Sequence, residues 1–361
     1  MIPAEAYAER RKRAAAEVAG RSADGLAVSA LVNVRYLTGF TGSNGLLLLR
    51  ADGSSTLLTD GRYRDQAEAE TGSTPIVVRD LIATAGERIE GTWLCETHVL
   101  TVDEHRALAE AAEAELVPGE RLVEQLREVK DDAEVVALEK ACAISIEALR
   151  GLVDAGEFAG RTERQVARDL EQRMYELGAE AIAFDTILAS GSNSAIPHHR
   201  PTDRVLQRGD FVKIDFGARV DGYHADCTRT FALGPPSAWQ KEVHGVVQAA
   251  QAAGVAALRT GAPLNECDRV AREILAEAGW LEYFTTGIGH GVGLEIHEDP
   301  FVGRRDAGTL AAGTALTMEP GIYVPDRGGV RIEDTVIVGG GADGQGPRVL
   351  TPMTTDLLEI A

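Results

Sequence analysis

Two aspartates stand at matching distances from a predicted hairpin turn. Residues 212–231, VKIDFGARVDGYHADCTRTF, contain two strand-like runs that flank Val220-Asp221-Gly222, a plausible turn. Without a bulge, Asp215 and Asp226 would face each other across the strands with Cβ atoms about 5 Å apart. Carboxylates that close repel each other, and desolvation among apolar residues adds to the cost. A bound cation resolves the conflict, whereas a single aspartate here would indicate only a solvated turn.

A second carboxylate pair repeats this arrangement. In residues 314–338, TALTMEPGIYVPDRGGVRIEDTVIV, Glu319 and Glu333 are symmetric about Asp326 and again lie among apolar strand residues. Two divalent cations would neutralise four carboxylates, and hydrolytic sites with two metal ions about 3.5–4 Å apart are common. The sequence therefore predicts that the two hairpins meet around a pair of metal ions.

The segment GIGHGVGLEIHE supplies a candidate imidazole ligand, His290. Glycines permit close approach of the backbone, so a side chain among them can reach a crowded site. The glycines around the histidine are Gly287, Gly289, Gly291 and Gly293.

The carboxylate pairs belong to a region with an internal repeat. The tetrapeptide VARD at 166–169 recurs as VARE at 270–273, and the offset of 104 residues (270 − 166) also separates Asp215 from Glu319 (319 − 215). Each copy lies on a predicted helix that closes with a glycine and precedes a β-rich region. We expect an α+β domain with a pseudo-twofold axis, in which each half consists of a helix followed by a hairpin.

The first of these repeated helices has a clear start and a clear core face. Thr162 and Gln165 form a predicted capping box. An apolar stripe at helical spacing is expected to be buried. Its members are Val166, Leu170, Met174 and Leu177.

The first 120 residues have a different pattern. Strand-like runs at 46–49, 56–58 and 75–78 alternate with helical patterns, which favours a small α/β domain. The helical patterns follow Asp60, Leu81 and Asp103. The alternation ends near Pro118-Gly119, so we place two domains at 1–126 and 127–361.

Composition limits the function classes. A chain of 361 residues that is 44% hydrophobic can bury a core in each of two domains. A formal charge of −20 opposes both nucleic acids and anionic membrane surfaces. The four cysteines lack CxxC spacing and are interpreted as reduced core thiols. Without a long apolar run or a signal-peptide pattern, the protein is expected in the cytoplasm.

Four of these segments, DFGARVDGYHADCTRTF, GHGVGLEIHE, MEPGIY and GVRIEDT, resemble the metal-dependent methionine aminopeptidase, aminopeptidase P and prolidase superfamily, peptidase family M24. The resemblance covers residues 127–361 and implies a pita-bread fold with a dinuclear site for manganese, cobalt or zinc, of which we favour manganese. It implies that Asp215 chelates one metal, that Asp226 and Glu333 bridge both, and that His290 and Glu319 complete the shell of the other. A metal-bridging hydroxide would be the nucleophile.

The same resemblance implies roles for further residues. Glu319 matches the glutamate that transfers the proton as general base and then acid. His297 matches the histidine that contacts the scissile carbonyl and the oxyanion, and His198 matches one that borders the substrate pocket. Tyr323 and Arg331 match groups that contact the metal ligands but not the metals themselves. Arg331 either orients a bridging carboxylate or forms a plain salt bridge.

His199, beside His198, matches nothing in the family pattern. We expect it to be an exposed loop histidine.

The first domain resembles the creatinase-like N-terminal domain of aminopeptidase P and prolidase, through YLTGFTGSNG and DGRYRDQA. Methionine aminopeptidases lack this domain. The resemblance therefore implies peptide substrates with proline at the second position, and a homodimer in which this domain borders the partner's site. Arg62 would contact a peptide terminus there or form a structural ion pair.

Three functions remain to be compared, two peptidase activities and one non-catalytic binding function. Archaeal-type prolidases follow the HE-x-P segment with an arginine that can bind a dipeptide carboxylate, whereas Phe301 stands here. This departure favours an Xaa-Pro aminopeptidase over an Xaa-Pro dipeptidase, unless Arg304, Arg305 or Arg331 replaces the missing cation. A non-catalytic peptide- or protein-binding module is the alternative of another class, and the five retained ligand positions argue against it.

Overall fold

The computed structural model describes residues 2–305, 308–342, 344 and 346–361. The chain divides into two compact units, Met1–Arg127 and Glu128–Ala361. Within the described ranges, no helix is long and apolar enough to cross a membrane. All four cysteines are buried and free, as expected for core thiols.

The first unit is built on a six-stranded mixed sheet in the order β4-β3-β2-β1-β5-β6. The strands are β1 (Gly25–Val28), β2 (Gly45–Arg50), β3 (Ser55–Thr59), β4 (Ile76–Val77), β5 (Glu90–Cys95) and β6 (Glu113–Pro118). The helices are α1 (Ala4–Gly20), α2 (Leu31–Thr38), α3 (Arg64–Thr71), α4 (Leu81–Gly86), α5 (Val102–Ala111) and α6 (Leu122–Glu128). Helices α1 and α2 contact β1 and β2, while α4 contacts β2 and β3. The predicted α/β character is confirmed.

The three strands and three helices named from the sequence all form in this unit, and the sheet also contains β1, β5 and β6, which the sequence did not single out. Strand β1 has only four residues, too few to show a period. Strand β6 (EAELVP) lies at the edge of the sheet and carries two glutamates, a composition that opposes edge-to-edge pairing and hides a strand from pattern reading.

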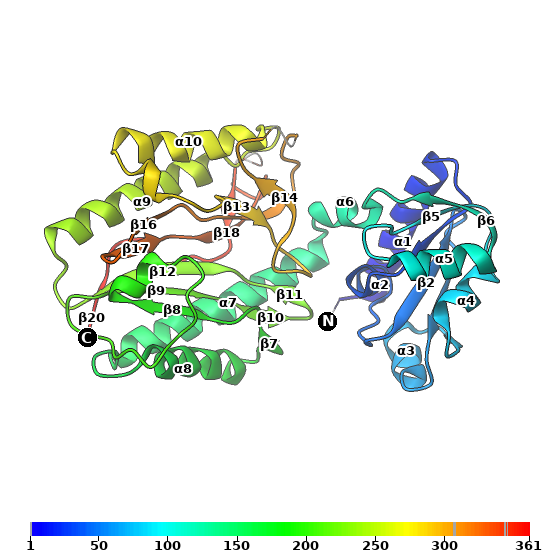
Figure 1. The fold of residues 1–361 in the computed structure, drawn as a ribbon, viewed down its shortest axis with the longest axis horizontal. Coiled ribbons are helices and arrows are strands. Elements are labelled where there is room, and N and C mark those ends of the chain that lie inside the picture. The colour runs from blue at the N-terminus through cyan, green and yellow to red at the C-terminus, as the bar shows by residue number, and fades with distance from the viewer. Residues whose placement is uncertain (1, 306–307, 343, 345) are drawn as a thin grey trace. The chain divides into compact units, whose positions relative to one another are not determined.

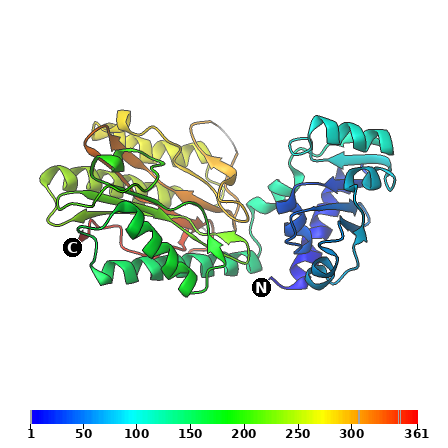
Figure 2. The same ribbon diagram turned by 60° about the horizontal axis from the view of Figure 1, so that its bottom comes forward.

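The second unit contains the same succession of elements twice. Its first half has α7 (Asp132–Ala155) and α8 (Glu163–Glu176), followed by β8 (Ile187–Ser190), β9 (Phe211–Phe216) and β12 (Cys227–Leu233). Its second half has α9 (Ala238–Ala257) and α10 (Leu264–Glu277), followed by β13 (Gly289–Gly291), β15 (Ala315–Met318) and β18 (Asp334–Ile337). In Figures 1 and 2 the strands lie between the green helices α7 and α8 and the yellow helices α9 and α10. The predicted α+β architecture is confirmed.

Helix α8 begins as predicted and ends slightly earlier. The Thr162 and Gln165 side chains form a reciprocal capping box. Val166, Leu170 and Met174 are fully buried, but Leu177 is 44% exposed, so its place in the core stripe was wrong. Leu177 is the C-cap residue, where the chain leaves the helical path before Gly178 with φ of 99°.

The two hairpins have different registers. Asp221 and Gly222 form the first turn with φ of 51° and 88°, and Asp215 pairs with Thr228. The prediction that Asp215 directly faces Asp226 was therefore wrong. Because Asp226 is two residues from Thr228, it still projects on the same face as a diagonal neighbour of Asp215.

In the second half, Met318 pairs with Asp334, and Gly321 pairs with Arg331 in a short separate ladder between β16 (Gly321–Val324) and β17 (Gly328–Arg331). This common register places Glu319 opposite Glu333, as their symmetry about Asp326 predicted.

Candidate metal centre

One cavity of about 670 Å³ receives the carboxylates of both halves. All five predicted ligands line it, namely Asp215, Asp226, His290, Glu319 and Glu333. His198 and His297 line the same cavity. Tyr323 and Arg331 are not among its lining residues, but Arg331 pairs with Asp215, which is one, and donates to the Tyr323 hydroxyl.

Thr228 connects the carboxylates of the two hairpins. It pairs with Asp215 on one side and forms an antiparallel bridge with Glu333 on the other. The backbone N–H of Glu333 donates to the Thr228 carbonyl over 3.1 Å, and the Thr228 hydroxyl donates to Glu333 Oε2 over 2.7 Å. The internal repeat thus brings together residues that are about 100 positions apart in the sequence.

His290 faces two of the carboxylates. Its Nε2 lies 3.5 Å from Asp226 Oδ2 and 3.4 Å from Glu319 Oε1. Its Nδ1 lies 3.0 Å from the Gly291 carbonyl oxygen, which fixes the proton on Nδ1. In this tautomer Nε2 carries no proton, so its lone pair is available to bind a metal on the side that faces the carboxylates.

Two of the four glycines around His290 are required by close approach of backbone atoms, and a third lies against a side-chain carboxylate. A Cβ at Gly289 would lie 2.1 Å from the Thr317 carbonyl oxygen, and one at Gly291 would lie 2.3 Å from that of Asp299. A Cβ at Gly293 would meet the Glu298 carboxylate at 2.4 Å. Gly287 has open space around it, so the same explanation was wrong for that position.

The carboxylates perturb one another strongly. Burial raises the pKa of Asp226 and of Glu333 well above the ordinary range, and neighbouring carboxylates raise both further. Burial likewise raises the pKa of Glu319 to about 7 and lowers the pKa of His290 to about 4. The raised pKa values oppose charge on the three carboxylates, and a bound cation would reverse them. The lowered pKa of His290 keeps its imidazole neutral, which is the form that binds a metal.

The donor set fits divalent cations. Asp226, His290 and Glu333 offer ligand atoms that all lie within 4.8 Å of one another. Asp215 Oδ1 is buried and accepts no hydrogen bond from any residue that the structure describes. A buried carboxylate oxygen rarely stays unpaired, and carboxylates with one imidazole suit manganese, zinc or cobalt.

Arg331 lies behind Asp215. Its Nη2 pairs with Asp215 Oδ2, and its Nη1 donates to the Tyr323 hydroxyl over 2.9 Å. Its Nε donates to the Thr228 hydroxyl over 3.0 Å. Arg331 therefore compensates part of the negative charge of the four carboxylates by pairing with Asp215. The two carboxylates that were predicted to bridge the metals are Asp226 and Glu333, so the ion pair of Arg331 is not with a bridging carboxylate.

The histidines around the cavity differ in their surroundings. The rings of His290 and His297 meet edge to face with centroids 4.4 Å apart. Burial lowers the pKa of His297, and His198, which lines the same cavity, lowers it further. His199 is only 8% exposed and hydrogen-bonded to Glu163, so the prediction of an exposed loop histidine was wrong.

Arg62, in the first unit, forms an exposed ion pair with Asp60 over 2.8 Å. Sequence reasoning overlooked Thr228, Glu163 and Lys213. Thr228 contacts Glu333 and Glu163 contacts His199, and both partners line the cavity. Lys213 binds backbone carbonyls just before His198. A polar residue within an apolar strand, as at Lys213 and Thr228, was the available signal.

Comparisons with known proteins agree with this site. Residues 136–339 match the model of metallopeptidase family M24, and residues 10–129 match that of the creatinase/prolidase N-terminal domain. An uncharacterized peptidase of Bacillus subtilis is 39% identical over 322 residues, which cover 87% of this chain and 91% of that protein. An Xaa-Pro dipeptidase of Pyrococcus horikoshii is 44% identical over 217 residues, which cover 60% of this chain and 62% of that protein.

Solved structures match both units. An Xaa-Pro dipeptidase from Bacillus anthracis superposes with a TM-score of 0.91 at 36% identity, over 98% of this chain and 100% of that one. An X-Pro aminopeptidase from Thermotoga maritima gives 0.89 at 34% identity, over 97% of this chain and 99% of that one. With the carboxylate and imidazole set in one cavity, these matches establish that the chain belongs to metallopeptidase family M24.

Proposed function

We propose that this protein is an Xaa-Pro peptidase, which hydrolyses the peptide bond that precedes a proline at the second position. The observation that carries the proposal is the convergence of four carboxylates and His290 Nε2 on one cavity. The printed activities of the relatives from Pyrococcus horikoshii, Bacillus anthracis and Thermotoga maritima support the choice of bond.

In this proposal two divalent ions, with manganese favoured over cobalt or zinc, are held by Asp215, Asp226, His290, Glu319 and Glu333. When bound, such ions lower the pKa of water far enough to supply a nucleophile at neutral pH. Glu319 is the most exposed of the four carboxylates. It would accept a proton from the attacking water and later return it to the leaving amine. His297 donates to the oxyanion. Arg331 and Tyr323 fix Asp215 from behind.

The length of the substrate defines two candidates. The first is an Xaa-Pro aminopeptidase, because Phe301 replaces the arginine of archaeal-type prolidases and its side chain is 55% exposed. The second is an Xaa-Pro dipeptidase, which the cavity itself supports through Arg168 and Arg200. Both arginines line the cavity and are exposed, and neither forms an ion pair with a described residue. Either guanidinium is suited to a dipeptide carboxylate.

The wider setting is also proposed. A creatinase-like domain at 1–126 would border the substrate site of a partner chain in a homodimer, and the catalytic domain would occupy 127–361. Four free, buried thiols support a reducing, cytoplasmic location. The net charge of −20 opposes nucleic-acid partners and anionic membranes.

The test compares a dipeptide Xaa-Pro with a tripeptide Xaa-Pro-Xaa, each on protein dialysed against a chelator and then supplied with Mn²⁺. We expect metal-restored cleavage of the tripeptide, and slower cleavage of a control peptide with alanine in place of proline. Cleavage of the dipeptide alone would identify a dipeptidase, and Arg168→Met or Arg200→Met should then raise its KM. Cleavage of neither peptide would contradict the proposal and favour a binding module.

A further inference from the structure

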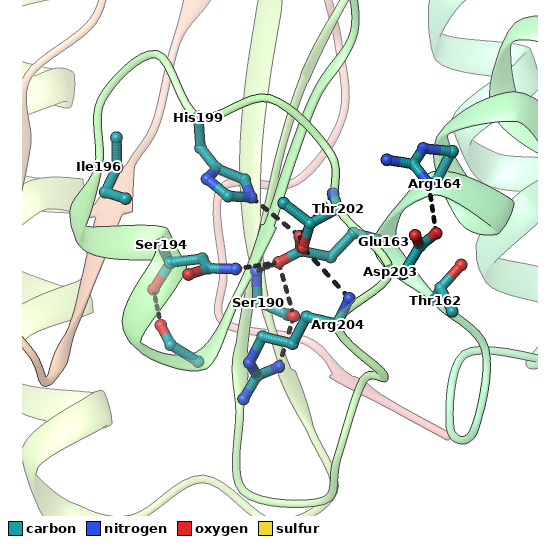
Figure 3. A network of polar contacts seen from close by, with 12 residues as sticks. Thr162, Glu163, Arg164, Ser190, Ser194, Ile196, His199, Thr202, Asp203 and Arg204 are labelled. Carbon is teal, nitrogen blue, oxygen red and sulfur yellow. Dashed lines mark hydrogen bonds and ion pairs between the residues drawn. The ribbon is translucent and has the colours of Figure 1, made fainter.

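A buried carboxylate outside the metal centre is bound entirely by the segment that carries His198. Glu163 is the first residue of α8, and its side chain is fully buried. Figure 3 shows Ser190, His199 and Thr202 directed at its carboxylate from the segment between residues 190 and 204. Nothing in the proposed reaction uses this charge.

Glu163 accepts six hydrogen bonds, three on each oxygen. Oε1 accepts from the Ser190 backbone N–H over 2.8 Å, from its hydroxyl over 2.9 Å and from Asn193 Nδ2 over 3.0 Å. Oε2 accepts from His199 Nε2 over 2.8 Å, and from the Thr202 backbone N–H and hydroxyl over 3.0 and 2.7 Å. Burial alone would raise the pKa of Glu163, but the bonds from His199, Asn193 and Thr202 outweigh it and lower the pKa to about 2.

The backbone of the same segment satisfies the start of α8. The Glu163 N–H donates to the Arg204 carbonyl over 3.0 Å, and the Arg164 N–H donates to the Thr202 carbonyl over 3.1 Å. The start of α8 is therefore joined to residues 190–204 twice, once through the Glu163 carboxylate and once through the backbone N–H groups of Glu163 and Arg164.

A second buried charge holds the residues just before His198. Lys213, in β9, is fully buried, and its Nζ donates to the carbonyls of Ser194, Ile196 and Pro197 over 3.1, 2.7 and 3.2 Å. Arg331 Nη1 also donates to the Pro197 carbonyl over 3.2 Å. The chain is thus fixed immediately before His198 by cations and immediately after it by Glu163 through His199.

Apolar packing contributes little to this segment. Ile196 is 49% exposed, and His198 itself is exposed to the cavity that it lines. Since few apolar side chains anchor the segment, its conformation depends on the polar contacts, and a misplacement of about 1 Å near reacting atoms can cost about 100-fold in rate.

We propose that Glu163 is a positioning residue that, through His199 and Thr202, holds His198 at the rim of the metal cavity. The proposal rests on the proposed function, in which the cavity that His198 lines receives the peptide. It also assigns His199 a role as the link between the buried charge and the active-site histidine. Glu163→Gln preserves the size of the side chain but turns an amide N–H₂ toward donors, so at least one set of contacts is lost.

The experiment is a double-mutant cycle of Glu163→Gln with His198→Ala in the full-length, Mn²⁺-loaded protein. We expect Glu163→Gln to lower kcat/KM for the Xaa-Pro tripeptide about tenfold in the wild-type background, but less than about twofold when His198 is already alanine. Asp169→Asn is the matched control, because Asp169 lies on the same helix and, among the described residues, forms ion pairs with Arg161 and Arg173 alone. It should leave kcat/KM unchanged.

Equal losses in both backgrounds would overturn the proposal, because they would mark Glu163 as a purely structural residue. If Glu163→Gln does not fold, Thr202→Val enters the same cycle with the same expectation and a smaller loss. Hydrogen exchange of residues 190–204 gives a readout independent of peptidase activity. Exchange should accelerate in Glu163→Gln and not in Asp169→Asn, and unchanged exchange would also overturn the proposal. If the wild-type protein cleaves no Xaa-Pro peptide, the proposed function fails, while exchange still decides whether Glu163 holds the segment.

Discussion

We expect Asp226→Asn to abolish peptide hydrolysis while the protein remains folded. Asp226 Oδ2 lies 3.5 Å from His290 Nε2, and the two share one group of ligand atoms with Glu333. An amide removes one negative charge from the site, and charge stabilisation by bound metal contributes several kcal/mol to such reactions. Since each 1.36 kcal/mol corresponds to a tenfold change in rate, we expect activity to fall by roughly a thousandfold or more. Glu333→Gln should behave alike.

The measurement is kcat/KM for an Xaa-Pro tripeptide, together with metal content and circular dichroism. Glu180→Gln is a suitable control, because Glu180 pairs with Arg219 near the surface of the same hairpin region. In metal-free protein Asp226→Asn should increase resistance to urea, because it relieves repulsion among buried carboxylates. A fully active Asp226→Asn variant would contradict its assignment as a metal ligand.

The second large effect concerns Arg331. Its side chain is 2% exposed and pairs with Asp215, so Arg331→Met leaves a buried carboxylate without its cation. Breaking a buried pair by removing one partner costs about 3–5 kcal/mol of unfolding free energy. We expect a loss of that size in metal-free protein and a smaller loss with Mn²⁺, because bound metal would also compensate Asp215.

Urea unfolding of the chelated and the Mn²⁺-loaded protein measures this difference. The control is Arg348→Met, which breaks the exposed pair with Glu139 and should cost less than about 1 kcal/mol. Similar losses for Arg331→Met with and without metal would show that Arg331 and the metal do not share Asp215.

The candidate ligands were predictable because each of two predicted hairpins carries a pair of carboxylates that is symmetric about its turn, and Asp215 and Glu319 lie at the offset of the internal repeat. The register of the first hairpin was not predictable to the residue. Its turn is the two-residue pair Asp221 and Gly222, so Asp215 pairs with Thr228 and Asp226 becomes a diagonal neighbour. A shift of two residues keeps both side chains on one face, so the predicted grouping survived an incorrect pairing.

The contacts behind the cavity were less accessible to sequence reasoning. Arg331 and Asp215 are 116 residues apart, and His199 and Glu163 are 36 apart. Polar partners at such separations have no local period, so the sequence indicates that they are polar but not what they bind. For this reason Arg331 remained ambiguous before the structure, and His199 was placed wrongly on the surface.

The measurement that tests the central claim most directly is a titration of metal-free protein with Mn²⁺, following bound metal and Xaa-Pro tripeptide cleavage together. We predict no cleavage without metal, and full activity when two ions are bound per chain. The Asp226→Asn and Glu333→Gln variants should bind fewer ions and remain inactive. Undiminished cleavage by protein shown to contain no bound metal would contradict the assignment of this cavity as a two-metal catalytic centre.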